Sequence, residues 1–231
     1  DTFNVTLFAT SNLNCDNYTT KKVIVFPNPT AKIENNNTFL CFKNHTINFV
    51  DSTKIASGTY TVKWFFGDGD STTTANPTHS YPKDSTFRVK LRAVSGKGCT
   101  ALDSQDITVN PTPSVLFSVN DSDQCLNGNS YTFTNTSTIR TGSISAHSWS
   151  FGDATASSAT SPTKVYTVSG AKTVRLIVTS DLGCNDTLSK QVMVFRKPTP
   201  AFTINDSTQC LTNNIFSFTN ASSIGGTDTM F

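Results

Sequence analysis

The chain has 231 residues, of which 36% are hydrophobic and 15% are charged, and its formal net charge is +2. This length suggests about two domains, and charged residues are scarce against a usual fraction of about 25%. Lys and Arg are scattered singly along the sequence, which makes nucleic acid a poor candidate partner. No apolar run approaches the roughly 20 residues that cross a bilayer, so we expect no membrane insertion of this segment.

The sequence repeats itself with a period of 84 or 85 residues. Two series of cysteines carry this period, Cys15, Cys99, Cys184 and Cys41, Cys125, Cys210. The period exceeds the roughly 20–50 residues of a solenoid repeat and suits a small β-sandwich. The register predicts the end of a unit in 1–27, complete units in 28–110 and 111–197, and the start of another in 198–231. Because half a sandwich cannot bury its core, we expect the natural protein to continue in both directions.

The apolar residues alternate with polar ones, as in half-buried strands. Phe87, Val89, Leu91 and Ala93 alternate with basic residues, which predicts that they share one buried face. Trp64 and Trp149 stand at matching places in the two complete units, and we expect both in the core. With turn signals at regular spacing and no helical period, the pattern predicts an all-β fold.

Two linked motifs suggest a family. Residues 64–70 read WFFGDGD and residues 76–81 read NPTHSY. Together they resemble the signature of PKD domains, a W-x-FGDG turn with a downstream NPTHxY. The next unit keeps WSFGD but has Ala154 for the following Gly, and it has Val165 where His is usual. The resemblance implies tandem immunoglobulin-like β-sandwich domains in a linear array.

The resemblance also implies a function. PKD domains serve mainly as extracellular spacers and interaction modules, and the cysteine pattern is similar to repeats of SprB-like gliding-motility adhesins of Bacteroidota and other type IX secretion cargo. We therefore expect a stalk segment of a cell-surface adhesin filament. Its partners would be neighbouring repeats of the same chain, surface polysaccharide, or other filament and adhesin proteins. The alternative is a set of polymer- or carbohydrate-binding accessory modules of a secreted hydrolase.

The sequence offers little site chemistry. Asp68 and Asp70 could contribute oxygens to Ca²⁺, but the turn lacks the spacing of an EF-hand. We expect Asp68 to bond to its own loop backbone instead. No Ser-His-Asp or Cys-His arrangement recurs across the units, so we expect no catalysis, no cofactor and no catalytic metal.

The cysteine pairing has several solutions. Bridges within units would join Cys41 to Cys99 and Cys125 to Cys184, resembling the bridge of antibody domains. Counting strand directions instead places the first cysteine of each unit at its far end and the second at its near end. This favours a bridge between domains, from Cys41 to Cys184, whereas free thiols remain the third option.

Several short segments fit an O-glycan acceptor known from Bacteroidota, Asp followed by Ser or Thr and then an apolar residue or Thr. The candidate acceptors are Ser52, Ser85, Thr187, Ser207 and Thr229.

Overall fold

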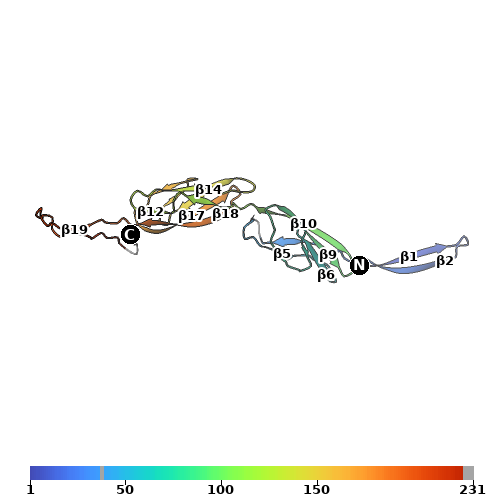
Figure 1. The fold of residues 1–231 in the computed structure, drawn as a ribbon. Coiled ribbons are helices and arrows are strands. Elements are labelled where there is room, and N and C mark those ends of the chain that lie inside the picture. The colour runs from blue at the N-terminus through green and yellow to red at the C-terminus, as the bar shows by residue number, and fades with distance from the viewer. Residues whose placement is uncertain (37–38, 226–231) are drawn as a thin grey trace. The chain divides into compact units, whose positions relative to one another are not determined.

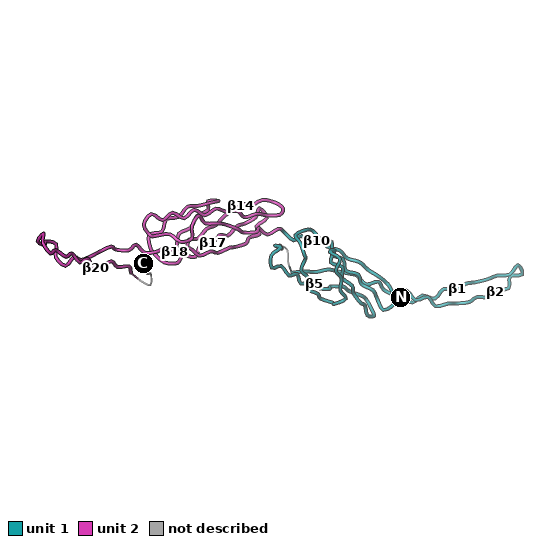
Figure 2. Tube along the Cα trace, in the orientation of Figure 1, with its two compact units in different colours: residues 1–110 teal, residues 111–231 magenta. Residues whose placement is uncertain are grey.

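A computed structural model describes residues 1–36 and 39–225, and within these ranges every regular element is a strand. The chain divides into two compact units, residues 1–110 and 111–231 (Figure 2). Each unit contains one complete β-sandwich (Figure 1), which we call the first sandwich (residues 28–110) and the second sandwich (residues 111–197). The prediction of an all-β fold built from tandem immunoglobulin-like sandwiches is confirmed.

The first sandwich packs a five-stranded sheet on a three-stranded sheet. The five strands, in sheet order, are β4 (Leu40–Cys41), β10 (Thr100–Asn110), β9 (Thr86–Ser95), β6 (Tyr60–Phe65) and β7 (Ser71–Thr72). The facing sheet contains β3 (Ile33–Asn35), β5 (Ile47–Asp51) and β8 (Thr78–His79). All pairs are antiparallel except β4 with β10, which is parallel.

The second sandwich repeats this topology strand for strand. Its larger sheet contains β12 (Asp123–Cys125), β18 (Asn185–Phe195), β17 (Gly170–Ser180), β14 (Ile144–Ser150) and β15 (Ala156–Ser157). Its smaller sheet contains β11 (Phe117–Val119), β13 (Tyr131–Asn135) and β16 (Thr163–Lys164). Strands at the same place in the two sandwiches can therefore be compared residue by residue.

The alternation along the strands builds both cores. In β9 the four residues predicted to face inward are buried, Phe87, Val89, Leu91 and Ala93. Trp64 and Trp149 have no exposed surface, and each indole N–H donates to a backbone oxygen, of Ala75 at 3.2 Å and of Ala159 at 2.9 Å. A buried Trp needs such a partner for its one polar group.

The chain traverses the first sandwich from one end to the other. Asp103 accepts a hydrogen bond from the backbone of Ile33, Gln105 accepts one from Asn35, and Leu40 pairs with Val109. The opening segment thus advances alongside β10 in the same direction. At about 3.3 Å per residue, the 11 residues of β10 span roughly 35 Å. The chain enters near the β9–β10 turn and leaves at the opposite end.

The chain also runs through the second sandwich from one end to the other. The Lys190 ammonium donates to the Phe117 oxygen at 2.6 Å, and the Met193 N–H donates to the Ser122 oxygen at 2.7 Å. The chain again enters near a hairpin turn, between β17 and β18, and leaves beside Phe195.

Each hairpin turn places a Gly or Asn with a positive φ directly before the cysteine. Asn14, Gly98 and Gly183 have φ values of 53°, 84° and 82°. Glycine and asparagine adopt this region more readily than other residues, which explains the recurring Gly-Cys or Asn-Cys pair.

Shorter pieces flank the two sandwiches. Strands β1 (Thr2–Thr10) and β2 (Asp16–Ile24) pair as β9 and β10 do, with Phe3 opposite Val23 where the first sandwich has Phe87 opposite Ile107. Strands β19 (Phe202–Ile204) and β20 (Phe218–Asn220) repeat β11 and β13. Phe3 is 52% exposed whereas Phe87 is 5% exposed. The division into 1–27 and 198–231 as parts of further domains stays a prediction.

Across the described ranges, no helix with the length and apolar character needed to cross a membrane is found.

Candidate functional site

The turn after β6 brings chemistry-bearing side chains together. Gly67 has a φ of +87°, and a side-chain carbon there would lie 2.7 Å from the backbone oxygen of Arg88. Gly152, at the same place in the second sandwich, has a φ of +75° and would meet the Thr173 nitrogen at 2.8 Å. Only glycine fits a turn that lies this close to the neighbouring strand. The turn therefore holds the following Asp in a fixed position.

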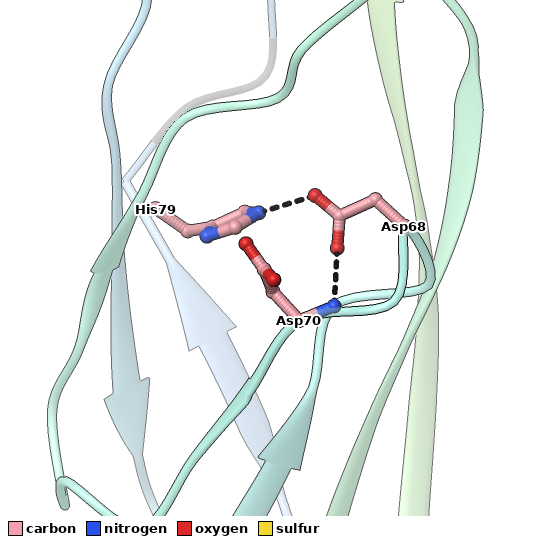
Figure 3. A group of neighbouring side chains, drawn as sticks. All are labelled: Asp68, Asp70 and His79. Carbon is pink, nitrogen blue, oxygen red and sulfur yellow. Dashed lines mark hydrogen bonds and ion pairs between the residues drawn. The ribbon is translucent and has the colours of Figure 1, made fainter.

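Asp68 links the turn to the facing sheet. Its Oδ2 lies 2.7 Å from His79 Nε2, and its Oδ1 accepts a 3.1 Å hydrogen bond from the Asp70 backbone (Figure 3). The predicted bond from Asp68 to its own loop is present. His79 also stacks flat on Phe66, with ring centroids 4.0 Å apart. Both side chains of the pair are largely buried, at 10% exposure for His79 and 5% for Asp68.

These contacts change the acidity of Asp68. Burial by itself raises the pKa of this carboxyl, but the hydrogen bonds from His79 and the Asp70 backbone outweigh it and hold the pKa below its usual value. Asp68 is therefore an anion tied to the imidazole.

Tyr81 completes the arrangement. Its hydroxyl donates to the Phe66 backbone oxygen at 3.1 Å, and its ring stacks on Phe87 at 4.0 Å. Burial, with a smaller contribution from the charge of Asp68, raises the pKa of Tyr81 well above its usual value. The two motifs seen in the sequence thus link the two sheets through Asp68, His79 and Tyr81. We call this link the tether.

Asp68, Asp70 and His79 are the group that could hold a metal ion within the described ranges. Their ligand atoms all lie within 4.8 Å of one another. Calcium, however, takes six to eight oxygen ligands, and both oxygens of Asp68 already accept hydrogen bonds. The residues present therefore fit a hydrogen-bonded tether better than a calcium site.

The second sandwich carries the same tether with different residues. Lys164, in β16, takes the place of His79, and its ammonium lies 2.7 Å from Asp153. The alignment of Val165 with the usual His is therefore wrong by one residue, since Val165 points outward and is 58% exposed. The residue counts from Pro to Tyr are equal in the two motifs, and this signal could have identified Lys164.

The electrostatics of the two tethers agree. Burial raises the pKa of Asp153, but hydrogen bonds from Lys164 and Thr155 outweigh it and hold the pKa below its usual value. The Tyr166 hydroxyl donates to the Phe151 oxygen at 2.8 Å, as Tyr81 does to Phe66. Thr155 stands where the first sandwich has Asp70, so the three-residue ligand cluster is confined to the first sandwich.

The other histidine with defined contacts serves the backbone. His45 Nδ1 lies 2.7 Å from the Phe42 oxygen, and its Nε2 accepts a 2.8 Å hydrogen bond from the Tyr81 N–H. Both ring nitrogens are thus occupied by a fold contact rather than presented to a substrate.

The cysteines fall into two states. Cys41 and Cys184 are disulfide-bonded, whereas Cys15, Cys99, Cys125 and Cys210 are free thiols. The two bridges within units, which need Cys99 and Cys125, are therefore not formed. Cys41 in β4 is the strand neighbour of Asn110 in β10, which places Cys41 at the end where the chain leaves the first sandwich. Counting strand directions predicted this position. The pairing of Cys41 with Cys184 stays a prediction.

The glycosylation candidates differ in accessibility. Ser85 and Ser207 are exposed, whereas Ser52 and Thr187 are partly buried. Thr229 lies outside the described residues. Modification at any of these sites stays a prediction.

Comparison with known proteins identifies the family. A family model described as PKD domain matches residues 27–109 and 110–195, so the chain belongs to the PKD domain family. Together with the disulfide, this membership indicates an extracellular or secreted protein.

Solved structures that are similar to parts of this chain include other PKD domains. The PKD1 domain of Vibrio anguillarum Epp is 30% identical, with coverage of 36% of this chain and 93% of that chain and a TM-score of 0.33. The PKD1 domain from the Vibrio cholerae metalloprotease PrtV is 27% identical, and the match covers 36% of this chain and 98% of that chain with a TM-score of 0.32. Fibronectin(III)-like modules of Clostridium thermocellum CbhA are similar at 16% identity, 71% and 95% coverage, and a TM-score of 0.36.

Proposed function

We propose that this chain is a non-catalytic stalk segment of a long cell-surface adhesin filament. The observation that carries the proposal is that each sandwich is entered at one end and left at the other. Domains with their termini at opposite poles extend a filament with every repeat, whereas domains with adjacent termini would not.

The connections support a stiff stalk. The segments that connect successive units contain two prolines each, Pro27 and Pro29, then Pro111 and Pro113. Proline fixes φ and limits the conformations available to a hinge. Short proline-containing connections therefore restrict bending between neighbouring domains.

The disulfide extends the same proposal. Cys41 lies at the end where the chain leaves the first sandwich, and Cys184 follows the β17–β18 turn, near which the chain enters the second. We propose that these two cysteines bond to each other. The free cysteines at equivalent positions, such as Cys99 and Cys125, would then bond to further repeats of the same protein. Tandem repeats of this kind are what the cysteine pattern resembles in the adhesins. Gliding motility and type IX secretion belong to this same proposal.

A non-enzymatic role agrees with the local chemistry. The tether residues are committed to hydrogen bonds between the sheets, and the second sandwich replaces His79 by a Lys while keeping the fold. A calcium titration followed by thermal unfolding tests this part. We expect no shift of the melting temperature, and a rise of several degrees would show that Asp68 and Asp70 bind the ion.

Pulling the full chain from its two ends tests the stalk and the bridge together. When reduced, each sandwich should unfold as a separate step that releases about 85 residues, or roughly 30 nm. When oxidised, a Cys41–Cys184 bridge would remove both steps, because the residues between the two cysteines no longer bear the load. Bridges within units would only shorten each step, and a single combined step would argue against independent domains.

The alternative, polymer-binding accessory modules of a secreted hydrolase, rests on aromatic rings that face outward. Phe65 is 36% exposed, and Phe8 and Tyr18 form an exposed pair with ring centroids 5.5 Å apart. The sequence of the parent protein separates the two functions, since a neighbouring catalytic domain would favour the accessory role.

A further inference from the structure

The outward face of the larger sheet in the first sandwich concentrates basic residues that are single in the sequence. In β9, Arg88, Lys90 and Arg92 alternate with the buried core residues and are exposed. In β6, Lys63 and Phe65 alternate in the same way and are also exposed. Because β6 and β9 are neighbours, four positive charges and an aromatic ring share one face.

The register sets like charges against each other. Lys63 lies directly opposite Arg92, and Phe65 lies opposite Lys90. Like charges at directly opposite positions destabilise a sheet. Arg88 is neutralised by Asp106 at 3.2 Å, but Lys63, Lys90 and Arg92 form no ion pair with a described carboxylate.

The second sandwich shows that the fold does not need these charges. The pair Lys63 and Arg92 corresponds there to Ser148 and Ile177, which are opposite each other in the same register. Phe65 corresponds to Ser150. One basic residue, Arg175, remains on the equivalent part of this face. The fold therefore does not require the like-charged pair of Lys63 and Arg92.

The basic face also contains a hollow. Strand β7 covers only Trp64 and Phe65 of the neighbouring edge of β6. Beside the uncovered part lies a hollow of about 680 Å³, whose lining includes Asp51, Tyr60, Thr61, Lys63 and Arg92. The Lys63 ammonium sits 5.1 Å from the centre of the Phe65 ring. Cationic groups and an apolar ring are thus accessible together, and the Asp51 carboxylate in the lining already accepts a hydrogen bond from the Thr53 N–H.

We propose that this face, built around Lys63, Phe65, Lys90 and Arg92, binds an anionic polysaccharide with carboxylate groups. The ammonium and guanidinium groups would pair with carboxylates along the polymer, and a sugar ring would pack on Phe65. A nucleic acid is a poorer match for this face. Duplex DNA carries a charge every ~1.7 Å, and proteins that bind DNA contact many phosphates, which needs more basic residues than this face offers. The proposal holds whether the domain belongs to a stalk or accompanies a hydrolase.

The test uses the full oxidised chain and measures its affinity for polygalacturonate. The variant Lys63→Ser with Arg92→Ile gives this face the residues of the second sandwich, and it should lose roughly tenfold in affinity. A matched variant, Lys83→Ser with Lys197→Ser, removes the same charge from exposed positions elsewhere and should bind as the natural chain does. Phe65→Ser should also weaken binding, and added salt should weaken it for the natural chain.

Thermal unfolding of each variant verifies that the fold is kept. The proposal is overturned if the matched variant loses as much affinity, or if neutral dextran binds as tightly as polygalacturonate. It is equally overturned if Phe65→Ser binds normally and duplex DNA binds as tightly as the polysaccharide, since the face would then be an unspecific polyanion patch.

Discussion

The two sandwiches solve the same packing problem with different side chains. In the first, Tyr81 stacks on Phe87, and His79 stacks on Phe66. In the second sandwich, lysines stand at the positions of Phe87 and His79. Lys172 places its ammonium 5.9 Å from the centre of the Tyr166 ring, and Lys164 lies 5.7 Å from the centre of the Phe151 ring.

The comparison shows what the tether requires. The position after the Pro-Thr pair must donate a hydrogen bond to a buried Asp and cover an aromatic ring. An imidazole does both by stacking, and an ammonium does both through a cation–π contact. The Gly cannot vary in this way, because a side chain there would clash with the backbone of the neighbouring strand, and the Asp supplies the acceptor for the donor on the facing sheet in both sandwiches.

The largest effect is expected from equivalent core deletions. Phe49 packs on Trp64, with centroids 5.4 Å apart, and Phe133 packs on Trp149 at 5.7 Å. Replacing either Phe by Ala should cost its own sandwich about 3–5 kcal/mol, because a cavity remains. Each sandwich contains one Trp, so urea unfolding with the other Trp replaced by Phe reports one sandwich at a time. A loss that spreads to the unmutated sandwich would show that the two cores are coupled.

The cysteines give the next effect. Cys184 is bonded, whereas the equivalent Cys99 is a free thiol. Under oxidising conditions Cys184→Ser should lower the free energy of unfolding by about 2–4 kcal/mol, and Cys99→Ser should change it little. Peptide mapping without reduction should recover residues around Cys41 linked to those around Cys184. Recovery of a Cys41–Cys99 peptide would refute the proposed pairing.

The glycines of the turn separate strain from contact. Gly67→Ala should cost about 2–3 kcal/mol, because it combines a positive φ with a clash against Arg88. Gly69 also has a positive φ but faces open space, and the second sandwich has Ala154 there with a φ of 64°. Gly69→Ala should therefore cost no more than about 1 kcal/mol. Chemical denaturation of both variants measures the difference, and equal losses would contradict it.

The smallest expected effect depends on pH. The pKa values of Asp68 and Asp153 are lowered in the folded state, so each stabilises the fold above about pH 4 and loses this contribution as pH falls. Asp68→Asn and Asp153→Asn should each cost about 1–2 kcal/mol at pH 7, and the cost should shrink below pH 4. Unfolding measured from pH 2 to 7 checks this. A cost that is constant over this range would mean that the charge of the Asp is not involved.

Much of the fold could be predicted from particular residues. The alternation in 87–93 predicted which side chains are buried, and the motifs around Trp64 and Trp149 predicted the family. The tether was predicted only in part. The sequence indicated that Asp68 would bond within its loop, but the link to His79 joins residues on two different sheets, and Lys164 was misplaced by one position.

The sequence alone determined the period, the alternation and the turn residues, because these follow from local backbone geometry and from the two-residue period of a strand. The tertiary structure decided which residues lie opposite one another. Lys63 and Arg92 are far apart in sequence and become a like-charged pair only when β6 and β9 adopt their register. A pattern along one strand contains no information about the partner strand, which packing between the sheets selects.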